Sequence, residues 1–448
     1  MGKAPTGDDG TDDGDVIQHL RSANRREDFG GRRAGEYTHW IEEQLSWKET
    51  CYVGDWSFLA NLRLTGPDAL DLLADLSINP FDSVDVGQGK HLVQCNEDGY
   101  VVADGVMVRT GDDEFVLHGV PCYWTHYNLE NGEYDASAEF RDTFNIQVQG
   151  PRSMDVFDAL ADHSLRDVGF MRSGTLGIAG TDVRAVRFGM SGEIGFELHG
   201  PIEAKETVWE AIREAGEPFG IRRLSVKTSA INQLEAGIAT RIRDFISAIF
   251  GEDMADYRAY LREHAHRDLI THPLEGSFEA DDISAWYRTP TELGWNYATF
   301  DRDFVGREAI EAEAADPDRT LVTLEWDADD VVDVYASLFG EGATYKYMDM
   351  PHQQKRSMVA DRVLVDGEDV GVATMRGYSY YFREMLSLCT IDVEHSEPGT
   401  EVTVLWGEGP NPTSPTVEDH VQKEIRATVA RTPYKADRRR GDLSMIED

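Results

Sequence analysis

The hydrophobic positions of this chain follow two different patterns, and the change between them divides the sequence. In the first two thirds, stretches that alternate apolar and polar residues are separated by stretches with helical spacing. From Arg319 onward the pattern consists of short alternating segments separated by Gly, Pro and Asp. The sequence therefore predicts α+β units of ferredoxin-like type, followed by a small β-barrel or sandwich.

The same spacing predicts the individual elements. Helical periodicity predicts helices at residues 36–47, 67–76, 151–161, 202–215 and 242–264. Alternation predicts strands at residues 58–64, 91–94, 101–109, 114–119, 145–149, 181–188 and 195–199, and then at 320–326, 361–365, 370–375, 386–390, 402–406 and 425–429. We expect three regions: a mobile acidic N-terminus (1–28), a region of two α+β subdomains (29–318) and a C-terminal β-barrel domain (319–448).

The net charge of the chain limits the classes of binding partner. The 448 residues include 83 acidic and 43 basic residues, which gives a net charge of −40 and disfavours nucleic acids and anionic membranes. The acidic residues are spread along the chain, and 41% of residues are hydrophobic, so we expect packed domains with a surface adapted to high salt. No apolar run is long enough to span a bilayer, and the N-terminus lacks the apolar stretch of a signal peptide, so a cytoplasmic protein is expected.

Metal chemistry has little support in the sequence. The four cysteines are far apart and form no Cys-x-x-Cys pair. The histidines His264, His266 and His272 with Asp268 fit no structural zinc spacing. We therefore expect no metal site.

Several blocks of sequence indicate a particular family. They are LGWNYATFDRDFVGREAI at 293–310, GYVVADGVMVR at 99–109, FNIQVQGPRS at 144–153, SGEIGFEL at 191–198 and NQLEAG at 232–237. Together these blocks resemble the glycine-cleavage T-protein (aminomethyltransferase) family, and the similarity runs from about residue 40 to about residue 434. Four further blocks, at 334–339, 377–388, 399–408 and 416–420, resemble the branch of tetrahydrofolate-dependent vanillate- and syringate-type O-demethylases.

This resemblance implies both a fold and an activity. The fold would be two ferredoxin-like folate-binding subdomains followed by a C-terminal β-barrel. The activity would be that of a methyltransferase or demethylase, which moves a methyl group from a small methoxy (aryl ether) donor to the cofactor tetrahydrofolate. Two enzymatic alternatives stay open, an aminomethyltransferase and a sulfonium demethylase. A non-catalytic folate-binding accessory protein is the alternative of another class.

Asp104 is the candidate catalytic residue. It follows a run of apolar strand residues, where a partly buried carboxylate needs a donor or a raised pKa. By the resemblance, the matching aspartate lies beside the reactive nitrogen of folate. A turn-forming Asp before Gly105 is the alternative.

Four residues are candidates for binding the cofactor. A carboxylate offers two acceptors to the N–H edge of a pterin ring, and the resemblance places such a glutamate in the block 191–198. Glu197 alternates with the apolar neighbours Phe196 and Leu198, so we favour it over Glu193, which suits an exposed turn. Trp295 and Tyr37 are the aromatic side chains that we expect to stack on the ligand.

The departures from the family leave the donor open. The run 228–233 contains no arginine, where the family has one that holds a folate carboxylate, and Arg241 or Arg243 could replace it. The tyrosine expected near Ser229 and the arginine expected near Val120 are also missing. A basic group in the pocket would favour a carboxylate donor, whereas a purely aromatic pocket would favour a neutral or sulfonium donor. The sequence leaves open the oligomeric state and the residue that protonates the leaving group.

Overall fold

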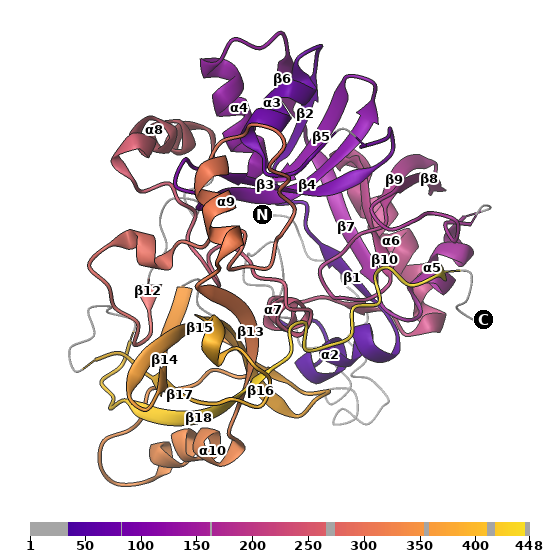
Figure 1. Ribbon diagram of the computed structural model, residues 1–448. Coiled ribbons are helices and arrows are strands. Elements are labelled where there is room, and N and C mark those ends of the chain that lie inside the picture. The colour runs from indigo at the N-terminus through magenta and orange to yellow at the C-terminus, as the bar shows by residue number, and fades with distance from the viewer. Residues whose placement is uncertain are drawn as a thin grey trace, which may run out of the picture.

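The strands of this protein form three sheets, of five, six and seven strands (Figure 1). The computed structural model describes residues 35–81, 83–161, 164–265, 274–353, 358–409 and 417–443. The N-terminal segment 1–28 that the sequence analysis expects to be mobile lies outside these residues. Of the described helices, none is long and apolar enough to cross a membrane.

The five-stranded sheet is antiparallel and has the order β3-β4-β5-β2-β6. Its helix α3 buries Leu72, Leu73 and Leu76 in the core of this unit, which is the helical spacing that predicted it. The elements are β2 (Asn61–Thr65), α3 (Ala69–Leu76), β3 (Gly89–Cys95), β4 (Val101–Gly111), β5 (Glu114–Gly119), α4 (Pro121–Asn131) and β6 (Ser137–Phe140).

The six-stranded sheet has the order β11-β1-β7-β10-β9-β8. In β7, Phe144, Ile146 and Val148 point into the core beneath the two helices of this unit, while the residues between them face the other way. The elements are β1 (Tyr52–Asp55), β7 (Thr143–Gln149), α5 (Ser153–Leu160), β8 (Ser173–Ile178), β9 (Thr181–Val186), β10 (Gly195–Pro201), α6 (Lys205–Gly216) and β11 (Arg222–Arg223).

These two units repeat one topology, which the sequence does not reveal as a repeat. In each, the chain runs strand, helix, three strands, helix, strand, and the strands take equivalent places in the sheet. The difference is β1, which enters the second sheet between β7 and β11. The predicted pair of ferredoxin-like subdomains is confirmed, but their strands are interleaved along the chain, because β1 precedes the whole first unit and belongs to the second.

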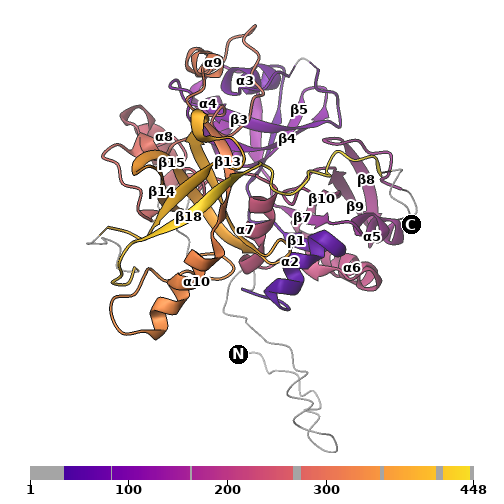
Figure 2. The same cartoon turned by 60° about the horizontal axis from the view of Figure 1, so that its bottom comes forward.

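The third sheet closes into a β-barrel of six strands, because β14 pairs with β17 as well as with β15 (Figure 2). The predicted barrel is therefore confirmed. The short strand β12 adds to its rim by pairing with β14, although it lies before residue 319. The elements are β12 (Leu274–Glu275), β13 (Arg319–Trp326), α10 (Ala328–Ala336), β14 (Met358–Val365), β15 (Glu368–Ser379), β16 (Glu384–Asp392), β17 (Glu401–Trp406) and β18 (Lys423–Ala430).

One helix joins the three units. Helix α7 (Val226–Glu235) is buried at nearly every position and packs against β15 of the barrel and against α2 (Trp40–Glu49). Both views place it at the centre of the molecule (Figures 1 and 2). Its first turn is closed by a capping box between Ser225 and Thr228. Buried Glu235 at its end accepts from Trp47 and pairs with Lys48 at 2.7 Å, which ties α2 to α7.

Two predicted helices are shorter than the pattern indicates. The helix expected at 36–47 begins at Trp40, because the Glu43 carboxylate accepts the backbone N–H groups of Tyr37 and Thr38 outside it. The helix expected at 242–264 is formed only over α8 (Ala255–His264). Before it, Ile242 has a positive φ of 75° in a turn, and the residues that follow are irregular, with Ala248 donating to the carbonyl of Val101. Helix α9 (Arg307–Ala315) follows the left-handed turn at Gly306.

The segment after β18 packs against the second unit. After β18, residues 431–443 leave the barrel and run across to the second sheet, as the C-terminal trace shows in both views (Figures 1 and 2). Arg438 donates its backbone N–H to the carbonyl of Gly192, and Leu443 is buried in the core of the second unit. Residues 431–443 thus line one side of the space between the units.

Candidate active site

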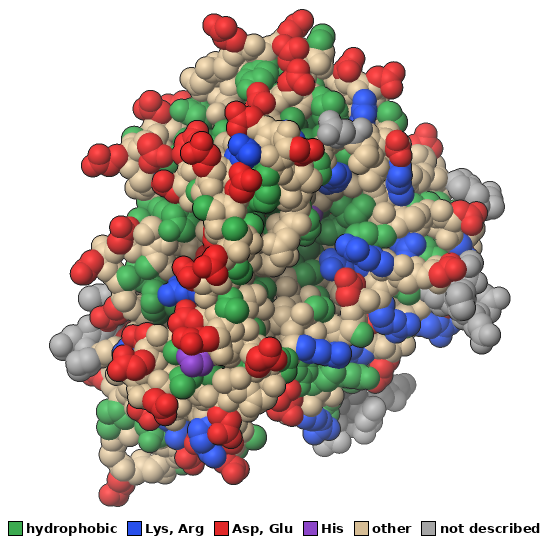
Figure 3. All heavy atoms as spheres, viewed as in Figure 1, with side chains coloured by type: hydrophobic (Ala, Val, Ile, Leu, Met, Phe, Trp, Pro, Cys, Tyr) green, Lys and Arg blue, Asp and Glu red, His purple; other side chains and the backbone are tan. Residues whose placement is uncertain are grey.

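A cavity of about 1790 Å³ lies where the two sheets, helix α7 and the mouth of the barrel meet. It opens as a hollow at the centre of the face in Figure 3. Its lining comes from β3, β4 and β5 of the first sheet, β7 and β10 of the second, the loop that follows α7, the block 293–297 and the C-terminal segment. Each unit therefore contributes part of one chamber.

Glu197 faces this cavity from β10. Its neighbours Phe196 and Leu198 point into the core of the second unit, so the carboxylate lies on the opposite face of the sheet. Gln147 Nε2 donates to Glu197 Oε1 at 2.6 Å, and Asn145 Nδ2 donates to Oε2 at 3.4 Å. Burial raises the pKa of Glu197 to about 7, although these two hydrogen bonds oppose the rise.

This raised pKa predicts a dependence of stability on pH. The unfolded chain ionises Glu197 near its usual pKa of 4.5, whereas the folded protein holds the proton up to about pH 7. The folded state binds more protons than the unfolded state in this pH interval. The stabilising free energy from protonated Glu197 is therefore fully present below the pKa of the unfolded state and is lost as pH rises through the pKa of the folded state. Relative to Glu197→Gln, wild type without ligand should lose up to about 3 kcal/mol between about pH 4.5 and about pH 8.

Urea unfolding of both proteins at the two pH values, in high salt, measures this difference. Glu203→Gln, a change at an exposed glutamate just after the same strand, is the matched control and should show no such dependence. An unchanged difference between wild type and Glu197→Gln at the two pH values would contradict a raised pKa.

Asp104 lies across the cavity on β4, opposite Val93 of β3. His91, two residues before Val93, shares that face, and its Nε2 lies 3.2 Å from Asp104 Oδ2. On the other side of the imidazole, Nδ1 lies 3.4 Å from the hydroxyl of Tyr297. The rings of His91 and Trp295 meet edge to face with their centroids 4.8 Å apart. All four functional side chains line the cavity.

Two histidines mark the place where the sheets meet. His118 pairs with Asn61 across β5 and β2, and His199 pairs with Asn145 across β10 and β7, at equivalent places of the repeated units. Their rings lie 4.2 Å apart at 30°. Burial lowers the pKa of His118 to about 4 and also lowers the pKa of His199. Both rings are therefore neutral at physiological pH, and the stack carries no charge into the cavity.

The groups around Glu197 fit a pterin ring. A pterin presents adjacent N–H donors along one edge, and Glu197 offers carboxylate oxygens towards the cavity. Beside it, the buried Oδ1 of Asn145 has no hydrogen-bond partner among the described residues. An unpaired buried acceptor is costly unless a ligand supplies the donor. The acceptor set therefore matches the hydrogen-bonding edge of a reduced folate.

A family model described as GCVT N-terminal domain matches residues 16–249. The chain belongs to the glycine-cleavage T-protein (GCVT) family. It is 33% identical over 444 residues to syringate O-demethylase from Sphingobium sp. (strain NBRC 103272 / SYK-6), with 96% of this chain and 95% of that protein covered. It is 36% identical over 421 residues to sesamin methylene transferase from Sinomonas sp. (strain No.22), with 89% of each covered.

The solved structures agree with this assignment at the level of the fold. Glycine cleavage system aminomethyltransferase T from Bartonella henselae superposes with a TM-score of 0.65. The two chains are 17% identical, and the match covers 94% of this GCVT-family chain and 97% of the other. The arrangement of two α+β units and a barrel is thus the arrangement of the family.

Two of the residues proposed from the sequence lie elsewhere in this GCVT-family fold. Among the described residues, neither Glu193 nor Tyr37 belongs to the lining of the cavity. Glu193 pairs with Lys435 at 2.5 Å and with Arg438 at 3.8 Å, so it fastens the C-terminal segment. Tyr37 packs its ring against the Arg223 guanidinium, 4.2 Å from its centroid. These contacts support structural roles for both, whereas Glu197, Trp295 and Asp104 line the cavity.

Four polar residues of the site, Asn145, Gln147, His91 and Tyr297, were not predicted from the sequence. Asn145 and Gln147 alternate with core residues in the block FNIQVQ, and this alternation could have placed them beside Glu197. His91 could have been found as the polar residue on the Asp104 face of the preceding strand. Nothing in the sequence points to Tyr297, because the loop that carries it has no regular period.

The cavity is locally basic in a strongly acidic protein. Its lining contains three acidic residues, Asp104, Glu197 and Asp437, and seven basic ones: Lys90, Arg241, Arg243, Lys346, Arg376, Arg439 and Arg440. Figure 3 shows Lys and Arg side chains gathered beside the hollow, on the side where the C-terminal segment runs in Figure 1, while Asp and Glu dominate elsewhere on this face. This reversal of charge favours anionic ligands.

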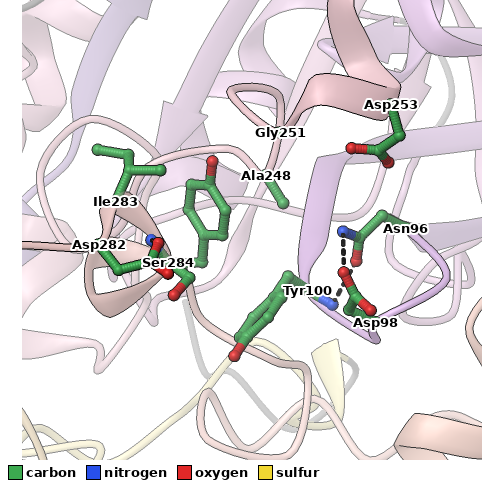
Figure 4. A pocket seen from close by; sticks show the side chains of 10 residues that line it. Asn96, Asp98, Tyr100, Ala248, Gly251, Asp253, Asp282, Ile283 and Ser284 are labelled. Carbon is green, nitrogen blue, oxygen red and sulfur yellow. Dashed lines mark hydrogen bonds between the residues drawn. The ribbon is translucent and has the colours of Figure 1, made fainter.

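A second, smaller cavity of about 310 Å³ lies outside this chamber (Figure 4). Asp98, Asp253 and Asp282 surround it, and Asn96 donates to Asp98 at 3.5 Å. Within the described part of the chain, no group of three or more His, Cys, Asp or Glu side chains could hold a metal ion. Three histidine-cluster positions, His266, Asp268 and His272, lie outside the described residues. The larger cavity is therefore the candidate active site.

Proposed function

We propose that this protein is an enzyme that transfers a methyl group from a small methoxy donor, an aryl ether, to tetrahydrofolate. One observation carries the proposal: a single cavity brings the Glu197 acceptor set of one sheet opposite the Asp104–His91–Tyr297 group of the other. The two relatives, an O-demethylase and a methylene transferase, support one-carbon transfer in this branch of the family.

The cofactor's place follows from the polar groups. Glu197, Asn145 and Gln147 would hold the pterin edge, and Trp295, which lines the same cavity, would stack on the ligand. When bound, tetrahydrofolate supplies a nucleophilic amine that accepts the methyl group. The protein's own contribution is to hold donor and acceptor in line and to exclude bulk water.

The basic lining supports a donor that carries a carboxylate. Arg376 is buried; it donates to the Asp349 carbonyl at 2.8 Å and contacts the Met385 sulfur at 3.1 Å. Among the described residues it forms no salt bridge, and the nearby Asp349 and Asp361 carboxylates only oppose the lowering of its pKa by burial. Arg241 and Arg243 line the same cavity, near the place of the missing family arginines. A cationic sulfonium donor would meet these charges unfavourably, so methoxybenzoates fit better.

We therefore expect turnover with a methoxybenzoate. The protein is incubated in high salt with tetrahydrofolate and one donor at a time. The donors are a panel of methoxybenzoates, a sulfonium donor and an aminomethyl donor. Chromatography of the folate products should show methyl-tetrahydrofolate with at least one methoxybenzoate and the matching phenol in equal amount. Uncharged methoxybenzenes of the same shape are the control for the basic lining and should react more slowly.

The other outcomes identify the alternatives. Product from the aminomethyl donor alone would make the protein an aminomethyltransferase, and product from the sulfonium alone would make it a sulfonium demethylase. Tight folate binding without turnover of any donor would favour the non-catalytic accessory protein. Each of these results would overturn the proposed O-demethylation.

The proposal extends to partners and location. A net charge of −40 is incompatible with favourable contacts to nucleic acid or an anionic membrane, so we propose a small-molecule donor as the partner. We further propose a cytoplasmic enzyme that works at high salt, where screening weakens the self-repulsion of the acidic surface.

A further inference from the structure

We propose that Tyr297 is the proton donor to the leaving oxygen of the methyl donor, and that His91 and Asp104 position its hydroxyl. This inference rests on the proposed demethylation and adds the residue that completes it. It concerns two side chains, Tyr297 and His91, to which the sequence assigns no role.

The geometry is a continuous line of polar contacts. Asp104 Oδ2 lies 3.2 Å from His91 Nε2, and His91 Nδ1 lies 3.4 Å from the Tyr297 hydroxyl. The imidazole is only 23% exposed and the carboxylate 20%, so this part of the line is shielded from water. Tyr297 is 39% exposed and lines the cavity, so its hydroxyl lies at the ligand end of the line.

Aromatic packing fixes the imidazole between its partners. The His91 ring meets both Trp295 and Tyr297 edge to face, at interplanar angles of 87° and 84°. The backbone N–H of Tyr297 donates to the Trp295 carbonyl at 2.8 Å, which holds the two aromatic residues in one turn. A carboxylate next to Nε2 favours a proton on that nitrogen, so Nδ1 is left to accept from the phenol. The contact of Nε2 with Asp104 thus fixes the tautomer and the orientation of the His91 imidazole, and these determine how Nδ1 meets Tyr297.

The chemistry of an aryl ether calls for such a donor. When the methyl carbon–oxygen bond breaks, the oxygen keeps the electron pair and would leave as a phenolate, whose conjugate acid has a pKa near 10. A tyrosine has a similar pKa, about 10, so the proton transfer is nearly thermoneutral. Burial raises the pKa of Tyr297, so the phenol keeps its proton at neutral pH until the leaving oxygen develops charge.

The step balances without another reactant. Tyr297 has a single hydroxyl proton, which points to His91 Nδ1 before reaction and turns about the phenol carbon–oxygen bond to the departing oxygen. The acceptor amine forms the new bond to the methyl carbon, the carbon–oxygen bond of the donor breaks, and Tyr297 gives this proton to the departing oxygen. The amine releases one proton when it becomes methylated, and that proton returns through water to the tyrosine oxygen. The products are the methylated acceptor and a neutral phenol, and the protein is restored.

Substituents on the donor test this role. We expect Tyr297→Phe to lower the single-turnover rate about 10²-fold for a methoxybenzoate with an electron-rich ring, but less than about threefold for a nitro-substituted one. The nitro group stabilises the phenolate, so that oxygen leaves without a proton. Tyr381→Phe, at a half-exposed tyrosine outside the cavity lining, is the matched control and should leave both rates unchanged. An equal loss on both donors would assign Tyr297 a merely structural role and overturn the proposal.

A second measurement needs neither folate nor turnover. In ¹⁵N-histidine spectra of the folate-free protein, Tyr297→Phe should shift the His91 Nδ1 resonance, and Asp104→Asn should shift the Nε2 resonance, while Tyr381→Phe shifts neither. An Nδ1 resonance that does not shift in Tyr297→Phe would show that the contact is absent and would overturn the proposal.

Rescue by imidazole is a third measurement. Imidazole added to His91→Ala should restore the rate on the electron-rich donor about tenfold; the absence of rescue, with the fold intact, would count against the proposal.

The failure of this inference and the failure of the proposed function give different results. Wild type that methylates folate from no ether refutes the proposed function, and the tyrosine's role falls with it. Wild type that is active while Tyr297→Phe shows no dependence on the leaving group refutes the tyrosine's role alone.

Discussion

Asp104→Asn is expected to lower the methyl-transfer rate by about 10²-fold or more, with the fold and the affinity for reduced folate preserved. The carboxylate contacts His91 inside the cavity, and the proposed line of contacts from Asp104 to Tyr297 begins with it. Asparagine keeps the size of the side chain but removes its charge, so it weakens the hold on the imidazole. Single-turnover formation of methyl-tetrahydrofolate from the best methoxybenzoate measures the effect.

The control for this change lies on the same hairpin. Asp113→Asn removes a carboxylate from the exposed turn between β4 and β5 and should leave the rate at the wild-type value. Calorimetric titration with tetrahydrofolate checks that the affinity of Asp104→Asn is unchanged. If Asp104→Asn were as active as wild type, Asp104 would be a polar residue of strand β4 without a catalytic role.

Glu197→Gln is expected to weaken the binding of tetrahydrofolate by roughly 1.5–3 kcal/mol, or about 10- to 150-fold in Kd. The Glu197 carboxylate accepts from Asn145 and Gln147 and faces the cavity, where a charge-assisted hydrogen bond to the pterin edge would form. Calorimetric titration in high salt, at a pH above 7 so that the carboxylate is ionised, measures the loss.

The same titration separates Glu197 from general effects of charge. Glu203→Gln removes one negative charge from an exposed position just beyond the same strand, and its affinity should equal that of wild type. Equal affinities of Glu197→Gln and wild type would exclude Glu197 as the pterin anchor. The stability of the ligand-free Glu197→Gln protein at high pH, expected to exceed that of wild type, shows that any loss of affinity does not come from unfolding.

Together the two results would describe a site with separate tasks on its two walls. The second sheet recognises the cofactor through Glu197 and its amide partners, and the first sheet handles protons through Asp104 and His91. The repeated topology explains why the walls face one another, since equivalent strands meet at the His118–His199 stack. The basic lining then serves the anionic ends of both ligands.

Much of the fold could be predicted because its signals are local. Strand β5 begins and ends where alternation places it, and the barrel strands are found at every predicted position. The orientation of Glu197 was also predictable, since two apolar neighbours in a strand fix the face of the residue between them. The helix expected at 242–264 was the main failure, because the apolar residues before α8 are buried in an irregular segment against the first unit, where tertiary packing overrides the helical period.

The sequence by itself determined the family, the kinds of secondary structure and one carboxylate on each wall of the site, because each depends on neighbouring residues or on short blocks in a fixed order. Only the tertiary structure decided how the site is assembled. Tyr297 meets His91 across 206 positions of sequence, and Glu193 is taken up by Lys435 of the returning C-terminal segment. Contacts of that range depend on how whole units pack, and no local period encodes them.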